Sequence, residues 1–234
     1  MTQSPIVQYA LRDGVAEITM DDGKANVMTD PMLGALSEAF ARAQADAAVV
    51  LLSGRPRMFS GGYDLAMFRR SPREIATTLR AGGTLVRRIL SFPRPVVAAC
   101  QGHAVAQGAF MLLSADVRVG ALGDFKIGLN EVAIGLTIPH YGVEVARMRL
   151  TPPWFNHATL TGTLYTPEQA LTAGFFDATV SAGEVLSSAR DFAHKLTQID
   201  AGAHAGTKLR VRRAALAAID EGNASEFELP APEA

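Results

Sequence analysis

Short apolar segments alternate along the chain with longer segments of helical periodicity, and this alternation limits the possible folds more than any other feature. AVVLLSG at 48–54 and VVAAC at 96–100 have the length and residue content of buried strands. Between them lies a helix pattern that a capping box of Ser71 and Glu74 opens and that Pro93 ends. Strands that alternate with helices predict an α/β fold in which helices cover the faces of a sheet.

The regions before and after these strands extend the pattern. Two strands over 6–13 and 15–22 meet at an Asp-Gly dipeptide, which is a strong hairpin signal. Further capping boxes begin at Thr166 and Ser181. Two amphipathic helices are predicted over 189–196 and 205–219.

The C-terminal helices divide the chain in two. We predict a core over 1–199 and a helical segment over 200–234 that serves in oligomerisation or as a lid and ends loosely after Glu221. The apolar stripe of this segment, which includes Leu209 and Leu216, must dock either on the core or on a neighbouring subunit.

Charge and composition exclude several classes of function. The chain has 234 residues and a formal net charge of −1, which gives no electrostatic basis for binding nucleic acid or an anionic membrane. No apolar run approaches the roughly 20 residues of a membrane span, and the N-terminus lacks the pattern of a signal peptide. The His residues have no metal-binding spacing, and the single cysteine, Cys100, fits a reducing cytoplasm. We therefore expect a cytoplasmic protein without a metal.

Two predicted strands end in glycine-marked turns, MFSGGYDL at 58–65 and CQGHAVAQGAF at 100–110. A strand that ends in such a turn and opens a helix exposes unpaired backbone N–H groups. Two such turns side by side could direct two amides at one point and stabilise negative charge on a carbonyl oxygen. From spacing alone, two ordinary tight turns explain the same glycines.

Glu131 interrupts the apolar segment DFKIGLNEVAIGL at 124–136, in which no Lys or Arg follows Lys126. A carboxylate in apolar surroundings is costly unless it is paired or protonated. Two interpretations follow from the residues. Glu131 either caps a helix or pairs with a distant arginine, or it transfers protons in an apolar cleft, where burial would raise its pKa.

Four segments, in their order and spacing, together resemble the crotonase family, the enoyl-CoA hydratase/isomerase group. They are KANVMTDPMLGALSEAF at 24–40, AVVLLSGRPRMFSGGYDLAMF at 48–68, PRPVVAACQGHAVAQGAFMLLSADVRV at 93–119 and FKIGLNEVAIGLTIPH at 125–140. The resemblance runs from about residue 6 to residue 180. It implies a spiral of β-β-α units with a C-terminal helical module, and acyl-CoA thioester substrates. It also implies no cofactor beyond the CoA of the substrate, and assembly as trimers or dimers of trimers.

The resemblance implies that two backbone amides bind the thioester oxygen. FSGGYDL is similar to the family pattern F-x-A-G-x-D-[LI], which places the first donor at Tyr63. The second donor position falls on Gln107, between Ala106 and Gly108, where the family has a glycine-rich triplet. Gln107 must therefore adopt the required dihedral angles without strain.

The matched motifs also imply which residues contact the substrate. The turn at Lys24, Ala25 and Val27 would hold the adenine and pantetheine of CoA. The other substrate-contacting positions are Gly61, Gly62, Asp64, Leu65, Gly108, Phe110 and His140.

Several charged residues have more than one interpretation. Asp64 is expected to bond nearby backbone. Either His140 and Tyr141 line the acyl pocket, or His140 caps a helix. Asp116 is expected to be a turn or cap residue. The basic residues of the C-terminal helices either reach a CoA phosphate or form a solvated face; they are Lys208, Arg210, Arg212 and Arg213.

The carboxylates separate the activities of the family. Hydratases of this family use two, and the position of the first is Phe110 here, while GLNE supplies the second as Glu131. A double-bond shift from the 3-position to the 2-position needs only one base. IGLNE at 127–131 is similar to Δ3,Δ2-enoyl-CoA isomerases, which also lack the first glutamate, and this resemblance implies Glu131 as the proton shuttle. The alternatives are a hydratase with a single carboxylate and a non-catalytic acyl-CoA-binding protein.

Overall fold

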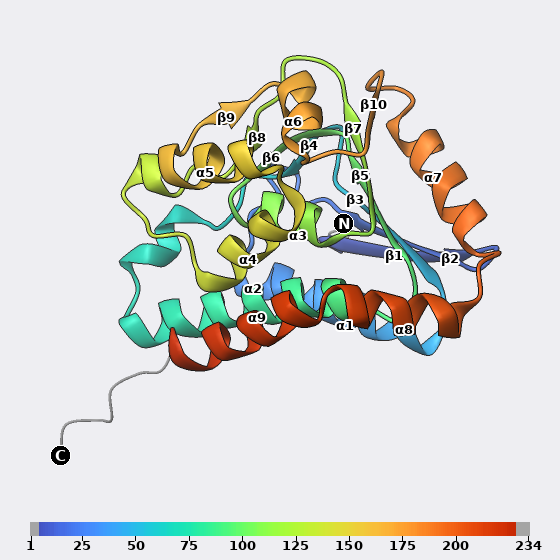
Figure 1. Cartoon of the computed structure of the whole chain (residues 1–234), viewed down its shortest axis with the longest axis horizontal. Coiled ribbons are helices and arrows are strands. Elements are labelled where there is room, and N and C mark those ends of the chain that lie inside the picture. The colour runs from blue at the N-terminus through green and yellow to red at the C-terminus, as the bar shows by residue number, and fades with distance from the viewer. Residues whose placement is uncertain (1–4, 228–234) are drawn as a thin grey trace.

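Six strands form the larger sheet of the computed structural model, which describes residues 5–227 (Figure 1). Their order is β1 (Val7–Arg12), β2 (Val15–Met20), β3 (Val49–Ser53), β5 (Val96–Cys100), β7 (Val117–Ala121) and β10 (Ala178–Val180). β1 and β2 pair antiparallel, and the other neighbours pair parallel. The predicted hairpin is confirmed, because Arg12 pairs with Val15 and both turn residues, Asp13 and Gly14, have positive φ.

The described residues also form a second, smaller sheet of four strands. Its order is β4 (Arg57–Ser60), β6 (Gly102–Val105), β8 (Ile127–Gly128) and β9 (Leu164–Tyr165). Three parallel strands of the larger sheet, β3, β5 and β7, are each followed by a strand of the smaller sheet and then by an α-helix. These helices are α2 (Pro72–Ser91), α3 (Gln107–Ser114) and α4 (His140–Arg149). The repeated order confirms the predicted α/β spiral of β-β-α units.

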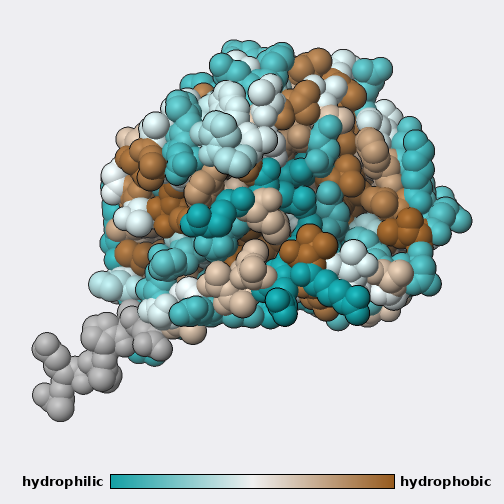
Figure 2. Space-filling view, viewed as in Figure 1, coloured by the Kyte–Doolittle hydropathy of each residue, from teal (hydrophilic) through white to brown (hydrophobic). Residues whose placement is uncertain are grey.

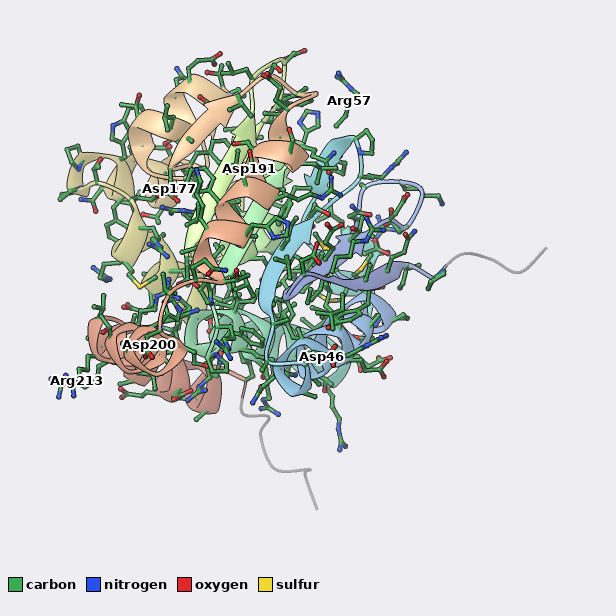
Figure 3. All side chains as sticks on the ribbon, turned by 90° about the vertical axis from the view of Figure 1, so that its right-hand side faces the viewer. Asp46, Arg57, Asp177, Asp191, Asp200 and Arg213 are labelled. Carbon is green, nitrogen blue, oxygen red and sulfur yellow. The ribbon has the colours of Figure 1, made fainter. Side chains whose placement is uncertain are left out.

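Helices cover both faces of the larger sheet. The remaining ones are α1 (Asp30–Ala45), α5 (Pro152–Thr161), α6 (Pro167–Ala173), α7 (Val185–Leu196), α8 (Ala201–Val211) and α9 (Arg213–Ser225), with short 3-10 helices η1 (Leu65–Arg69) and η2 (Val132–Ile134). Figure 1 shows α1, α2, α8 and α9 as a layer along the lower side, and Figure 3 shows α7 across the front of the sheet. Alternate residues of β3 serve the two faces, since Val50 and Leu52 face the main core while Val49 and Leu51 face α7.

Two of the three predicted capping boxes are confirmed. The side chains of Ser71 and Thr166 accept from the third helical residue, and Glu74 and Gln169 reciprocate. The third is wrong, because α7 begins after Glu184 and has no side-chain cap.

The C-terminal segment differs from the prediction in two ways. The single helix expected over 205–219 is broken at Arg212 into α8 and α9. α9 also continues to Ser225 and Phe227 is buried, so the expectation of a loose segment after Glu221 is wrong up to residue 227 and for 228–234 lies outside the described residues. Leu216 is buried in the main core of its own chain, whereas Leu209 is 47% exposed.

Asp116 holds the C-terminal helices to the core. Its carboxylate accepts from Lys208 Nζ at 2.7 Å, from Arg212 at 2.8 Å and from the backbone N–H of Val96 at 2.7 Å. Lys208 and Arg212 are only 6% and 5% exposed. Asp116 is therefore part of a buried ion cluster and more than a turn residue.

The buried cluster corrects the interpretation of the basic residues. Lys208 and Arg212 neither form a solvated face nor stand free for a phosphate. Arg210 and Arg213 are exposed, and Figure 3 shows Arg213 extending away from the helices.

None of the helices within residues 5–227 combines the length and the apolar character that crossing a membrane requires.

Removal of the Asp116 carboxylate should destabilise the fold strongly. Asp116→Ala leaves two buried cations without their anion, which costs about 3 to 5 kcal/mol in the free energy of unfolding. Urea unfolding measures this loss. The matched control is Asp220→Ala, which breaks a half-exposed pair with Arg87 and should cost about 1 kcal/mol or less. Equal losses in the two variants would contradict the assignment.

Candidate active site

A cavity of about 280 Å³ lies between the two glycine-marked turns, the segment around η2 and the end of α9. Most of its wall is apolar: Leu65, Phe68, Leu79, Phe110, Ile134 and Leu136. Its polar side chains include Glu131, Tyr63, Asn130, Thr137 and Glu226. This lining suits a long apolar group. Among the described residues, the charged side chains of the lining are the carboxylates of Glu131 and Glu226.

The two glycine-marked turns touch each other at this cavity. A Cβ on Gly62, whose φ is 89°, would lie 2.8 Å from the Cβ of Ala106 and 3.5 Å from the backbone nitrogen of Gln107. A Cβ on Gly108 would lie 2.5 Å from the carbonyl oxygen of Ser60. Any side chain at Gly62 or Gly108 would force the turns apart, so glycine is required at both.

The backbone N–H groups of Tyr63 and Gln107 are candidate donors to a bound carbonyl oxygen. Neither donates to another backbone group within residues 5–227. Gln107 is the first residue of α3, where an N–H has no partner in the helix and the helix dipole is positive. Both groups therefore remain available on adjoining turns that border the cavity.

The backbone strain falls on a different residue from the one expected. Ala106 has φ 52° and ψ −124°, a conformation that costs a non-glycine residue roughly 1–3 kcal/mol. Gln107 itself is helical. The Ala106 conformation turns the chain into α3, so the strained residue is next to the candidate donor.

Glu131 follows β8 and precedes η2, and it is 6% exposed. Its Oε2 is buried without a hydrogen-bond partner, and it forms no ion pair within the described residues. Its side chain does not cap η2 either. Burial raises the pKa of Glu131 from 4.5 to about 7. The two structural interpretations of Glu131, a helix cap and an arginine pair, are therefore wrong.

The surface outside Glu131 is also apolar. The large exposed apolar residues of η2 and α5 are Val132, Ile134 and Leu160. Figure 2 shows a brown area over these two elements at the left of the molecule. Glu131 thus has apolar neighbours both in the cavity and on the outer side.

Phe110 occupies the position at which a second carboxylate was considered. It is fully buried, lines the cavity and packs edge-on against Tyr141, with ring centroids 5.7 Å apart. A Cβ on Gly142 would lie 2.5 Å from the Phe110 ring. This close packing leaves an apolar wall where an acid would otherwise stand.

The turn expected to hold CoA lies beside the cavity. The backbone N–H of Gly61 donates to the carbonyl oxygen of Ala25 at 2.8 Å, and Lys24 is exposed. The carboxylate of Asp22 accepts from the backbone N–H groups of Lys24, Asn26 and Val27 and so fixes this turn. Lys24, Ala25 and Val27 do not line the cavity itself.

The other predicted site residues have mixed positions. Gly61 and Leu65 line the cavity, and Asp64 accepts from the backbone N–H of Ala66 at 2.9 Å, capping η1. His140 is exposed, lies outside the cavity lining and is the first residue of α4, whose cap is Pro139. The interpretation of His140 as a helix cap is therefore wrong, and its side chain does not line this cavity.

Sequence reasoning missed Glu226 and Asn130, and it expected Tyr141 in the acyl pocket, whose lining does not include it. Glu226 reaches the cavity from the end of α9, and its carboxylate accepts from the backbone N–H of His140 at 2.9 Å. Tyr141 lies behind the cavity wall and bonds both Tyr63 and Gln107. No local pattern indicates Glu226, because its position depends on how α9 packs against α4, whereas Asn130 directly precedes Glu131 in the chain.

Within residues 5–227, no group of three or more His, Cys, Asp and Glu residues is placed to hold a metal ion.

Comparison with known proteins identifies the family. Residues 10–228 match the family model described as enoyl-CoA hydratase/isomerase. A solved enoyl-CoA hydratase/isomerase family protein from Pseudomonas syringae is 43% identical, with a TM-score of 0.93, and the match covers 96% of this chain and 97% of that one.

Two further solved structures carry different activity names. An enoyl-CoA isomerase from Mycobacterium tuberculosis is 41% identical, with a TM-score of 0.91 and coverage of 95% and 97%. An enoyl-CoA hydratase from Mycobacterium ulcerans is 42% identical, with a TM-score of 0.91 and coverage of 94% and 96%. The family is thus common to all three, and the chain belongs to the enoyl-CoA hydratase/isomerase family, the crotonases.

Proposed function

We propose that this crotonase is an enoyl-CoA isomerase that moves a double bond from the 3-position to the 2-position of an acyl-CoA thioester. Glu131 is its one proton-transferring residue. The observation that carries the proposal is the buried carboxylate of Glu131, which among the described residues has no ion-pair partner and no hydrogen-bond partner for its Oε2, in a cavity where Phe110 takes the position of the other acid. The solved M. tuberculosis protein that is named an enoyl-CoA isomerase is similar to this chain in sequence and fold.

A single base is sufficient for this reaction. Ionised Glu131 removes a proton from C2 of the 3-enoyl thioester, and the electron pair moves through C2 onto the carbonyl oxygen to give a dienolate. The dienolate returns its electrons toward C4, which takes the same proton from Glu131, and the product is the 2-enoyl thioester. A pKa of about 7 suits a group that must both accept and return a proton at neutral pH.

The backbone N–H groups of Tyr63 and Gln107 would bind the thioester oxygen as it becomes negative. Such donors lower the barrier because they are already oriented before charge develops. Gly61, Gly62 and Gly108 let the two turns approach, and the turn at Lys24, Ala25 and Val27 would hold the CoA portion beside Gly61. The apolar wall would keep water from C3, where its addition gives a hydroxyacyl product.

The assembly is also a proposal. By resemblance to the family we expect a trimer or a dimer of trimers in the cytoplasm.

Replacement of Glu131 tests the proposal directly. Glu131→Gln keeps the shape of the side chain and removes the base, so kcat for conversion of 3-hexenoyl-CoA should fall by about 10³-fold. The absorbance of the conjugated thioester measures the rate. Binding of saturated hexanoyl-CoA should change by less than about threefold, because no proton moves on binding.

The matched control is Glu144→Gln, since Glu144 pairs with Arg147 on α4 outside the cavity lining. The Glu131→Gln protein should also be more stable at pH 8, by about 3 kcal/mol, because the native state no longer has to bury a carboxylate whose pKa is raised to about 7. Full turnover in Glu131→Gln would end the assignment of Glu131 as base. Acyl-CoA binding without turnover in the unmodified protein would favour the non-catalytic alternative.

The pH dependence follows from the raised pKa of Glu131. The base must be ionised, so kcat/KM should rise with pH through an apparent pKa of about 7 and fall about tenfold per pH unit well below it. A glutamate with its ordinary pKa of 4.5 would give a flat profile between about pH 6 and 8. Initial rates at saturating and limiting substrate distinguish these two results.

Hydration of a 2-enoyl thioester is the second candidate function, and the position of Glu226 supports it. Its carboxylate lines the same cavity as Glu131, and the N-terminus of α4 holds it there. A hydratase needs one group to activate water and another to supply a proton, and two carboxylates in one cavity could divide these roles.

The two enzymatic functions differ in product. We expect 3-hexenoyl-CoA to isomerise at least about 100-fold faster than crotonyl-CoA gains water, since Phe110 stands where hydratases of the family have their first acid. Mass spectrometry detects the added water. Comparable rates, with hydration lost in Glu226→Gln, would instead assign a hydratase that uses Glu226.

A further inference from the structure

A chain of hydrogen bonds joins the side chains of the two residues whose backbone N–H groups are the candidate donors. The hydroxyls of Tyr63 and Tyr141 are 2.9 Å apart, and the Tyr141 hydroxyl donates to Gln107 Oε1 at 3.0 Å. Gln107 Nε2 donates to the carbonyl oxygen of Gly82 at 3.2 Å. The chain thus crosses four elements: the turn after β4, α4, α3 and α2.

The direction of this chain is fixed by its last bond. The carbonyl of Gly82 only accepts, so the Gln107 amide nitrogen faces it and the amide oxygen faces Tyr141. Tyr141 donates its one hydroxyl proton to that oxygen, so in the bond between the two tyrosines Tyr63 must be the donor. Burial raises the pKa of both tyrosines, so both hydroxyls keep their protons at neutral pH.

The surrounding packing leaves the chain little freedom. A Cβ on Gly82 would overlap the Tyr63 hydroxyl, and a Cβ on Gly83 would lie 2.8 Å from the Tyr141 ring. Glycine within a helix costs roughly 1 kcal/mol relative to alanine, and α2 has two in succession at this contact. Tyr141 and Gln107 are fully buried, and Phe110 packs edge-on against the Tyr141 ring.

We propose that Tyr141 is a positioning residue that holds Tyr63 and Gln107 in the orientation that their backbone N–H groups need. Tyr141 does not line the cavity, so it acts through its two neighbours. The proposal rests on the proposed function, because it takes these two amides as the donors to the thioester oxygen. Loss of the Tyr141 hydroxyl removes the acceptor of Tyr63 and the donor to Gln107 Oε1 together, so the two residues are no longer tied to each other.

A purely structural role for Tyr141 makes a different prediction. If the hydroxyl only satisfies buried polar groups, its loss lowers stability and leaves the binding of the thioester oxygen unchanged. If it positions the donors, the polarisation of that oxygen weakens even where the protein stays folded. A displacement of about 1 Å at a reacting group can cost about 100-fold in rate.

The test uses Tyr141→Phe, which keeps the packed ring and removes only the hydroxyl. The probe is 2,4-hexadienoyl-CoA, a conjugated thioester whose absorbance moves to longer wavelength when donors polarise its carbonyl oxygen. We expect Tyr141→Phe to reduce that shift by at least half while its dissociation constant changes by less than about threefold. The kcat for 3-hexenoyl-CoA should fall by about 10- to 100-fold with little change in KM.

Two further variants complete the experiment. Tyr165→Phe removes a hydroxyl that bonds His157 at 2.7 Å outside the cavity, and it should leave both the shift and kcat unchanged. Tyr63→Phe breaks the same chain, so its effect should not add to that of Tyr141→Phe in the double variant.

The outcomes separate this proposal from the proposed function. An unchanged absorbance shift in folded Tyr141→Phe, with or without a loss of stability, overturns the positioning role. The absence of any shift in the unmodified protein overturns it as well. A shift in the unmodified protein that Tyr141→Phe weakens, without isomerisation of 3-hexenoyl-CoA by either, supports the positioning role and rejects the isomerase.

Discussion

The direct contact between the two glycine-marked turns is the constraint on which the site depends. Parallel pairing of β4 with β6 brings the two turns to the same edge of the smaller sheet. Because Gly62 has no side chain, the first turn can contact Ala106 of the second. Gly108 makes the same approach possible against Ser60. Even one methyl group added at Gly62 or Gly108 would separate the two backbone donors and widen the apolar cavity in which Glu131 is buried.

Features that depend on neighbouring residues were predictable from the sequence. The hairpin at Asp13 and the caps at Ser71 and Thr166 follow from local backbone chemistry, and all three are confirmed. The burial of Glu131 followed from the apolar residues on either side of it, and its pKa is raised as this pattern indicates.

Features that depend on distant residues were not predictable in the same way. Lys208 and Arg212 have the spacing of an exposed helix face, yet they meet Asp116, a residue 92 positions before Lys208. Glu226 enters the cavity from a segment whose composition indicates a loose terminus. A pattern of charges shows which residues share a side of a helix, and only the packing of the helix decides whether that side meets water or a buried carboxylate.

The long-range contacts converge on α3, the short helix that begins at Gln107. At its first residue the Gln107 side chain is tied to α2 and α4. At its last turn Arg149 donates to the carbonyl oxygens of Leu113 and Ala115, and Arg212 of the α8–α9 junction donates to that of Ser114. Cations at this end also complement the helix dipole. A helix of eight residues that is held at both ends cannot slide or tilt freely, so the C-terminal segment, though distant in sequence, helps to fix the backbone N–H of Gln107 in place.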